Sequence, residues 1–215
     1  QKVTFVLAEA QARQRQRGVD GLGQRGDVPI GLQFHEHRHM VATGVAFGGQ
    51  KGGLPRGVAA VLTARRAGDE TRRRLRLGLA FALVACHLTE YTVALWQGWY
   101  RIQMLPLEMC DLAAAFGIYA LLTRDPRAAG PAWFFALSGT LPALITPELN
   151  VTFPHVRFVV YFLEHGLTVI TPLVLVIGLG VVPPAGAWFR AALVLNAFAA
   201  FNGVLNVTLG TNFMY

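Results

Sequence analysis

Charged residues are scarce in this chain of 215 residues, because Asp, Glu, Lys and Arg together make up only 14% of it. Twenty of the 31 charged side chains lie in residues 1–76, which leaves 11 for residues 77–215. Hydrophobic residues make up 53%, and the mean hydropathy is +0.43. This fraction of charged residues is too low for the surface of an ordinary soluble domain. The composition therefore indicates an integral membrane protein that follows a polar, basic leader.

Cysteine is also scarce: Cys86 and Cys110 both lie in apolar runs, so the sequence predicts no disulfide framework. The first residues contain no apolar stretch of the kind that a secretory signal peptide needs. The net charge of +7 accompanies no known nucleic-acid-binding pattern, and we expect no nucleic-acid partner. Basic charge in such a chain governs membrane topology, so membrane lipids are the expected partners. No pattern predicts an oligomeric state.

The leader, residues 1–71, is rich in Gly, Arg and Gln and begins without Met. No amphipathic period extends across it, so we expect it to be disordered or misframed and to make no contact with the rest of the chain. The alternating histidines of HEHRH, residues 35–39, would share one face of an extended segment, as metal ligands can. No fourth ligand accompanies them. We therefore interpret them as solvated loop residues and predict neither a metal site nor a cofactor.

Five apolar segments follow the leader, and each is close to the ~20 residues that a helix needs to cross ~30 Å of hydrocarbon. They are residues 77–98, 104–123, 132–149, 157–181 and 187–209. Backbone polar groups in lipid must be hydrogen-bonded within the protein. The sequence therefore predicts an all-α, polytopic transmembrane bundle of about five spans over residues 72–215.

Arginine is distributed unevenly between the two ends of these segments. Nine arginines lie at the end where the first segment begins: Arg65, Arg66, Arg72, Arg73, Arg74, Arg76, Arg124, Arg127 and Arg190. Only Arg101 and Arg157 lie at the other end. Cytoplasmic loops carry an excess of Lys and Arg. We therefore expect a multi-pass protein of the cell membrane, with the residues before the first segment and the Arg124–Arg127 loop in the cytoplasm.

Ionisable and amide side chains interrupt the apolar segments, where they are unfavourable unless they serve a purpose. They are His87 and Glu90 in the first segment, Glu108 and Asp111 in the second, Glu164 and His165 in the fourth, and Asn202 and Asn206 in the fifth. We expect them to face the bundle interior and to form a polar pocket. Their structural alternative is hydrogen bonding between helices.

Cys110 lies between the two carboxylates of the second segment. A cysteine in a membrane segment usually packs as a small hydrophobic side chain. On a helix, Cys110 would share its face with Ala113, Ala114 and Gly117, and such small residues permit close helix packing.

Three motifs in this order resemble one family: LPLEMCDL at 105–112, TPELNVTFPHVRFVVYFLEHGL at 146–167, and NGVLNVTLGTNFMY at 202–215. Together they resemble the YwaF-like bacterial integral membrane proteins, which are related to eukaryotic transmembrane protein 164. The resemblance covers about residues 72–215. Glu108 stands where that family more often has His, and neither the family's first span nor its last span or two has a counterpart here. We therefore expect a truncated member.

The resemblance implies a cysteine-dependent lipid acyltransferase or hydrolase that acts on ether phospholipids or related lipid esters, as in the eukaryotic relatives. Carried over by motif, Cys110 is the nucleophile and His165 its base, because a thiol attacks as the thiolate. Glu164 or Glu90 would orient the imidazole. The carboxylates of Glu108 and Asp111 oppose this chemistry if they are ionised beside the thiol, since like charge disfavours the thiolate.

Two other functions remain open from the residues alone. Glu90, Glu108, Asp111 and His165 are suited to a proton or cation path in a transporter or channel. A structural membrane protein without catalytic activity is the third hypothesis. The distance between side chains discriminates among them, because a catalytic pair must meet within ~3 Å or through one water molecule, whereas a relay can extend across the membrane.

Overall fold

The structure, a computed structural model, describes residues 56–98, 102–147, 149 and 151–214. The expectations for residues 1–55, including the three histidines of HEHRH, lie outside the described residues. Every regular element in the described part of the chain is a helix, so the predicted all-α class is confirmed. In chain order the elements are α3 (Arg56–Arg66), α4 (Asp69–Trp96), η1 (Ile102–Met104), α5 (Met109–Thr123), α6 (Pro126–Phe135), η2 (Ala136–Thr140), α7 (Leu141–Ile145), α8 (Val156–Leu173), η3 (Val174–Gly178) and α9 (Ala187–Leu209).

Four helical stretches are long and apolar enough to cross a membrane: Asp69–Trp96, Pro126–Ile145, Val156–Gly178 and Ala187–Leu209. They correspond to four of the five apolar segments of the sequence. The remaining segment forms α5, which has 15 residues and begins at Met109 instead of residue 104. At 1.5 Å per residue, α5 is about 22 Å long, which is less than the ~30 Å of a hydrocarbon core.

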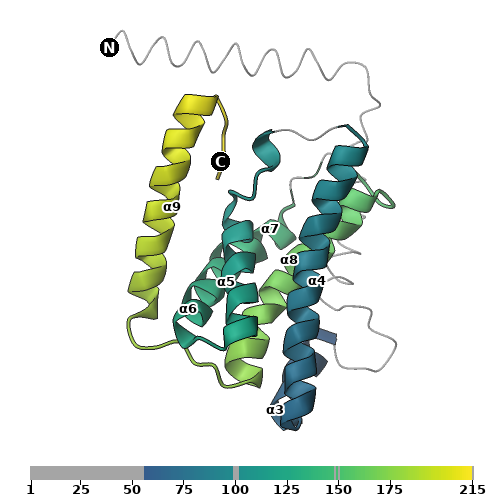
Figure 1. The fold of residues 1–215 in the computed structure, drawn as a ribbon, viewed down its shortest axis with the longest axis vertical. Coiled ribbons are helices and arrows are strands. Elements are labelled where there is room, and N and C mark those ends of the chain that lie inside the picture. Colours follow the sequence, from purple (N-terminus) through teal and green to yellow (C-terminus); the bar gives the residue numbers. More distant parts are fainter. Residues whose placement is uncertain (1–55, 99–101, 148, 150, 215) are drawn as a thin grey trace. The chain divides into compact units, whose positions relative to one another are not determined.

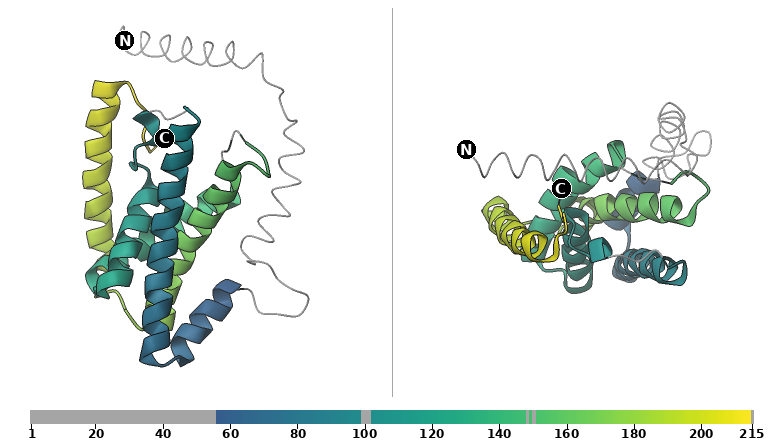
Figure 2. Two further views of the ribbon diagram at one scale, coloured as in Figure 1. Left: turned by 45° about the vertical axis from the view of Figure 1, so that its right-hand side comes forward. Right: turned by 90° about the horizontal axis from the view of Figure 1, so that it is seen from above.

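Helices α4, α5 and α8 pack against one another at the centre of the bundle (Figure 1). Helix α6 packs against α5, and α9 packs against α6. More than half of the apolar window of α8 is buried inside the protein (56%), but only 6% of that of α9. Figure 2 shows α9 at the edge of the helices in both further views. The chemistry of an interior site must therefore come mainly from α4, α5 and α8.

Small residues allow α5 to approach α8 closely. Ala113, Ala114 and Gly117 of α5 are all buried. A Cβ atom on Gly117 would lie only 3.0 Å from Cγ2 of Thr171 in α8. The face that Cys110 shares with these residues is thus a helix-packing face, as the sequence pattern predicts.

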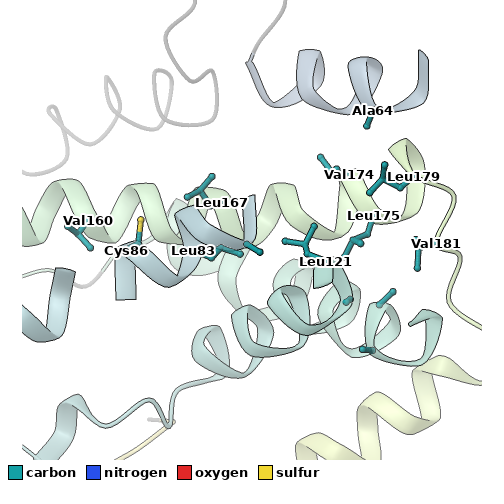
Figure 3. Close-up of a cluster of buried hydrophobic side chains, with 14 residues drawn as sticks. Ala64, Leu83, Cys86, Leu121, Val160, Leu167, Val174, Leu175, Leu179 and Val181 are labelled. Carbon is teal, nitrogen blue, oxygen red and sulfur yellow. The ribbon is translucent and has the colours of Figure 1, made fainter. Parts of the chain in front are cut away.

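The largest hydrophobic core cluster joins α3, α4, α5, α6 and α8 with η3 (Figure 3). Cys86 belongs to it and is 6% exposed, so this thiol packs as an apolar group. Ala64 of α3 also belongs to it and has no exposed surface. Our expectation that residues 1–71 make no contact with the bundle is therefore wrong for α3. Close packing explains the difference, because Cβ of Ala64 lies 2.7 Å from the position of a Cβ on Gly178.

Candidate polar cavity

A cavity of about 560 Å³ opens at the end of the bundle where α4 ends and where α5 and α8 begin. Its lining includes Cys110 from α5 and His165 from α8, which are the two residues expected to act together. The carboxylates of Glu90, Glu108, Asp111 and Glu164 line it as well, and so does the guanidinium of Arg157. The cavity therefore combines a thiol, an imidazole and several charged groups at one end of an otherwise apolar bundle.

Cys110 is the second residue of α5 and is partly buried. Its thiol is not part of a disulfide. Among the described residues, no hydrogen bond joins Cys110 Sγ to the ring of His165, although both side chains line the same cavity.

His165 is 6% exposed and is held in a defined orientation. Its Nδ1 lies 3.0 Å from the carbonyl oxygen of Tyr161, one turn earlier in α8. A carbonyl oxygen only accepts hydrogen bonds, so Nδ1 carries the proton and Nε2 of the neutral ring bears the lone pair. The ring also stacks on that of Tyr161, with centroids 4.0 Å apart. Tyr161 thus orients the imidazole, whereas we expected Glu164 or Glu90 to do so.

Tyr161 is in turn fixed by α7, because its hydroxyl donates a hydrogen bond of 2.9 Å to the carbonyl oxygen of Ala143. Sequence reasoning missed Tyr161. The signal was available, since residues four apart share one face of a helix and Tyr161 precedes His165 by four positions.

His87 of α4 lies beside the cavity and contacts carboxylates from two other helices. Its Nε2 is 3.6 Å from Asp111 Oδ1 and 3.3 Å from Glu164 Oε1. Glu90 has a different partner, because its Oε1 lies 3.7 Å from Nε of Arg157. His87 and Glu90 therefore both connect α4 to other helices.

The two carboxylates that flank Cys110 both take part in the beginning of α5. Glu108 is the N-cap, and its backbone N–H donates a 2.9 Å hydrogen bond to Asp111 Oδ2. This contact satisfies a backbone donor next to a helix N-terminus. The carboxylate of Glu108 accepts a 3.1 Å hydrogen bond from the backbone N–H of Met214 through Oε2. Both carboxylates beside the thiol therefore have a structural role, because each accepts a backbone hydrogen bond.

Asn202 and Asn206 do not line the cavity. The side-chain amide of Asn202 donates to the carbonyl oxygen of Leu107, at 2.9 Å, in the loop before α5. Asn206 binds the backbone of Phe213 twice, donating at 3.1 Å to its oxygen and accepting at 2.8 Å from its nitrogen. These bonds connect α9 to loops, whereas the sequence suggested hydrogen bonds between helices. They fold the C-terminal residues back so that Met214 reaches Glu108.

The model of the TMEM164 family matches residues 54–215 of this chain. No curated protein and no solved structure matches it. The family match includes α3, which the sequence motifs did not reach. It bears out the resemblance to transmembrane protein 164, and the relation to the YwaF-like bacterial proteins stays a prediction. Because the match covers three quarters of its length, the protein belongs to the TMEM164 family.

Proposed function

We propose that this protein is a membrane enzyme that transfers or hydrolyses the acyl chains of membrane lipids, with Cys110 as the nucleophile and His165 as the base. One observation carries the proposal: the thiol and the imidazole, from α5 and α8, line a single cavity of about 560 Å³. A cavity of this size has room for the ester region of a lipid. Its position at an end of the bundle suits an ester, because lipid esters lie at the boundary between headgroups and hydrocarbon.

The first half of the reaction forms a thioester. His165 Nε2 takes the proton of Cys110 Sγ, and the sulfur attacks the carbonyl carbon of the acyl ester. The carbon–oxygen bond to the lipid then breaks, and the leaving oxygen takes the proton from His165. The products are an acyl-thioester on Cys110 and a lysolipid.

The second half regenerates the thiol. His165 removes a proton from the acceptor hydroxyl, which is that of a lysolipid in transfer or of water in hydrolysis. The acceptor oxygen attacks the thioester carbonyl, the carbon–sulfur bond breaks, and the sulfur recovers the proton. The fixed tautomer of His165 supports both halves, because the same nitrogen, Nε2, receives and returns the proton.

The cavity faces the side opposite the cytoplasm in this proposal. Arg76 near the start of α4 donates hydrogen bonds to the carbonyl oxygens of Leu121 and Leu122, so the start of α4 and the end of α5 lie at the same level. That end carries the arginine-rich segments, which favour the cytoplasmic side. Cys110 begins the other end of α5.

A proton or cation path is the second candidate function, and the contacts among Arg157, Glu90, His87, Asp111 and Glu164 favour it. Such a path must continue to the other side of the membrane. Beyond His87, however, α4 contributes Cys86 and Leu83 to the apolar core cluster. That cluster occupies the interior between the charged groups and the arginine-rich end, where a path would have to continue. The hypothesis of an enzyme is therefore better supported.

The test uses the purified full chain in vesicles that contain isotope-labelled diacyl and ether phospholipids together with a lysophospholipid acceptor. We expect acyl transfer or fatty-acid release by the natural chain and its loss in Cys110→Ser and His165→Gln. Cys86→Ala is the matched control, because Cys86 packs in the apolar core away from the cavity. Full turnover by Cys110→Ser would refute the proposed nucleophile. Proton flux without lipid turnover would establish the alternative.

A further inference from the structure

Three helices bring together a group of potential metal ligands beside the cavity. His87 comes from α4, Asp111 from α5 and Glu164 from α8, and their ligand atoms all lie within 4.8 Å of one another. Nitrogen and oxygen donors of these kinds are the ligands of zinc and related divalent cations. No helix could supply this set alone, so the cluster depends on the packing of the central helices.

Two of the three separations fit a single ion, and the third, between the Asp111 and Glu164 oxygens, is within 4.8 Å. His87 Nε2 lies 3.3 Å from Glu164 Oε1 and 3.6 Å from Asp111 Oδ1. Ligands that bind zinc at about 2.0–2.2 Å in tetrahedral geometry are about 3.3–3.6 Å apart. The imidazole nitrogen is therefore at a suitable distance from both carboxylates, and the Asp111 and Glu164 oxygens can share a common centre if they lie at a similar distance from each other.

On His87 and Asp111, the polar atom that does not contact the cluster is already engaged. His87 Nδ1 lies 3.0 Å from the carbonyl oxygen of Leu83 and so donates to it. Asp111 Oδ2 accepts from the N–H of Glu108 at 2.9 Å, which leaves Oδ1 toward the cluster. Metal-binding histidines usually donate their other ring N–H in this way, which orients the ligating nitrogen.

Charge supplies an independent argument. The Glu164 side chain is only 5% exposed, and within the described residues its one close partner is His87. With Nδ1 as the donor, the lone pair of a neutral His87 points at two carboxylate oxygens. Buried negative charge of this kind is compensated by a cation, which is either a protonated His87 or a bound metal ion. A divalent ion at the common centre would compensate both carboxylates at once.

We propose that His87, Asp111 and Glu164 bind a divalent cation of the zinc type. The imidazole favours zinc, iron or a similar ion over magnesium or calcium. Asp111 and Glu164 also line the cavity, so the ion has coordination positions open toward it. The sequence predicted no metal site, so this proposal departs from that expectation. It stands apart from the proposed acyl chemistry, since neither Cys110 nor His165 is a ligand.

Metal content tests the site directly. The detergent-purified full chain is stripped with a chelator, incubated with Zn²⁺, desalted and measured by inductively coupled plasma mass spectrometry. We expect about one zinc ion per natural chain, as a three-ligand site with an open position holds. His87→Gln, Asp111→Asn and Glu164→Gln should each lose it. Glu90→Gln is the matched control and should keep it, because Glu90 lies one turn along α4 but pairs with Arg157.

Two further measurements separate this proposal from the others. Cys110→Ser should keep its zinc whether or not the protein turns over lipid, and loss of zinc there would overturn the ligand set. Co²⁺ bound to the natural chain should show d–d absorption without a thiolate charge-transfer band, which remains informative even if a ligand variant does not fold. The site would be refuted if the natural chain retained no zinc. It would also be refuted if the natural chain and the three ligand variants retained equal amounts of zinc per chain.

Discussion

Gly117 of α5 and Thr171 of α8 lie so close together that a Cβ atom on the glycine would be 3.0 Å from Thr171 Cγ2. This contact sets the separation of the two helices that carry Cys110 and His165. Nine in ten real Cβ contacts are longer, so a larger residue at position 117 requires the Thr171 side chain or the helices to move.

Gly117→Val should therefore reduce stability by about 1–3 kcal/mol, as overpacking of a close interface does. The matched control is Gly203→Val in α9, where a Cβ would meet nothing within 4 Å. Thermal unfolding of both variants in the same detergent measures the difference. Equal melting temperatures for the two variants would show that the α5–α8 contact is not close in the protein.

Asn202 should matter more than Asn196, although both side chains donate to a backbone oxygen. Asn202 is 1% exposed and bridges α9 to Leu107, whereas Asn196 is exposed and bonds to Ala192 in its own helix. Loss of a buried hydrogen bond leaves its partner unsatisfied and costs about 1–3 kcal/mol. We expect Asn202→Ala to lower the melting temperature and to expose the loop before α5 to protease. Equal protease sensitivity of Asn196→Ala and Asn202→Ala would contradict this role.

Helix α3 should behave as part of the bundle. Ala64→Glu places an ionisable group in the core cluster, where burial of an unpaired charge is strongly unfavourable. We expect this variant to lose most of its folded yield in detergent, as judged by size-exclusion chromatography. Thr63→Glu is the control, since residue 63 is exposed on the same helix. A normal elution profile for Ala64→Glu would mean that α3 does not pack there.

Topology is tested with single cysteines in a chain that carries Cys86→Ala and Cys110→Ala. Thr123→Cys and Thr146→Cys are both exposed, and they lie at the arginine-rich end and the cavity end of the bundle. The arginine distribution predicts that a membrane-impermeant maleimide labels the second in intact cells and the first only after permeabilisation. The reverse pattern would invert the proposed orientation.

The helical class followed from the sequence because long apolar segments have few alternatives in lipid. The residue at which α5 begins did not follow from the sequence. Pro106 and the N-cap Glu108 begin that helix at Met109, and local cap chemistry was hidden within an apolar run. Helix α3 was also missed, because it packs against η3, and Ala64 lies beside Gly178, more than a hundred residues later.

Candidate site residues were recognisable by type, but their partners were not. His87 was a conspicuous ionisable group in an apolar segment, yet its contacts with Asp111 and Glu164 depend on how three helices pack. Asn202 and Asn206 stood out for the same reason. Their partners are backbone atoms of loops, and sequence spacing contains no information about which loop packs beside a helix.

The most direct test of the proposed chemistry is the covalent state of Cys110. After incubation with lipid vesicles and rapid acid quenching, peptides of the purified chain are analysed by mass spectrometry. The account predicts an acyl group on Cys110 that hydroxylamine removes, and its accumulation when the acceptor lysolipid is withheld. Lipid turnover in which Cys110 is never acylated, under any acceptor concentration, would contradict the account.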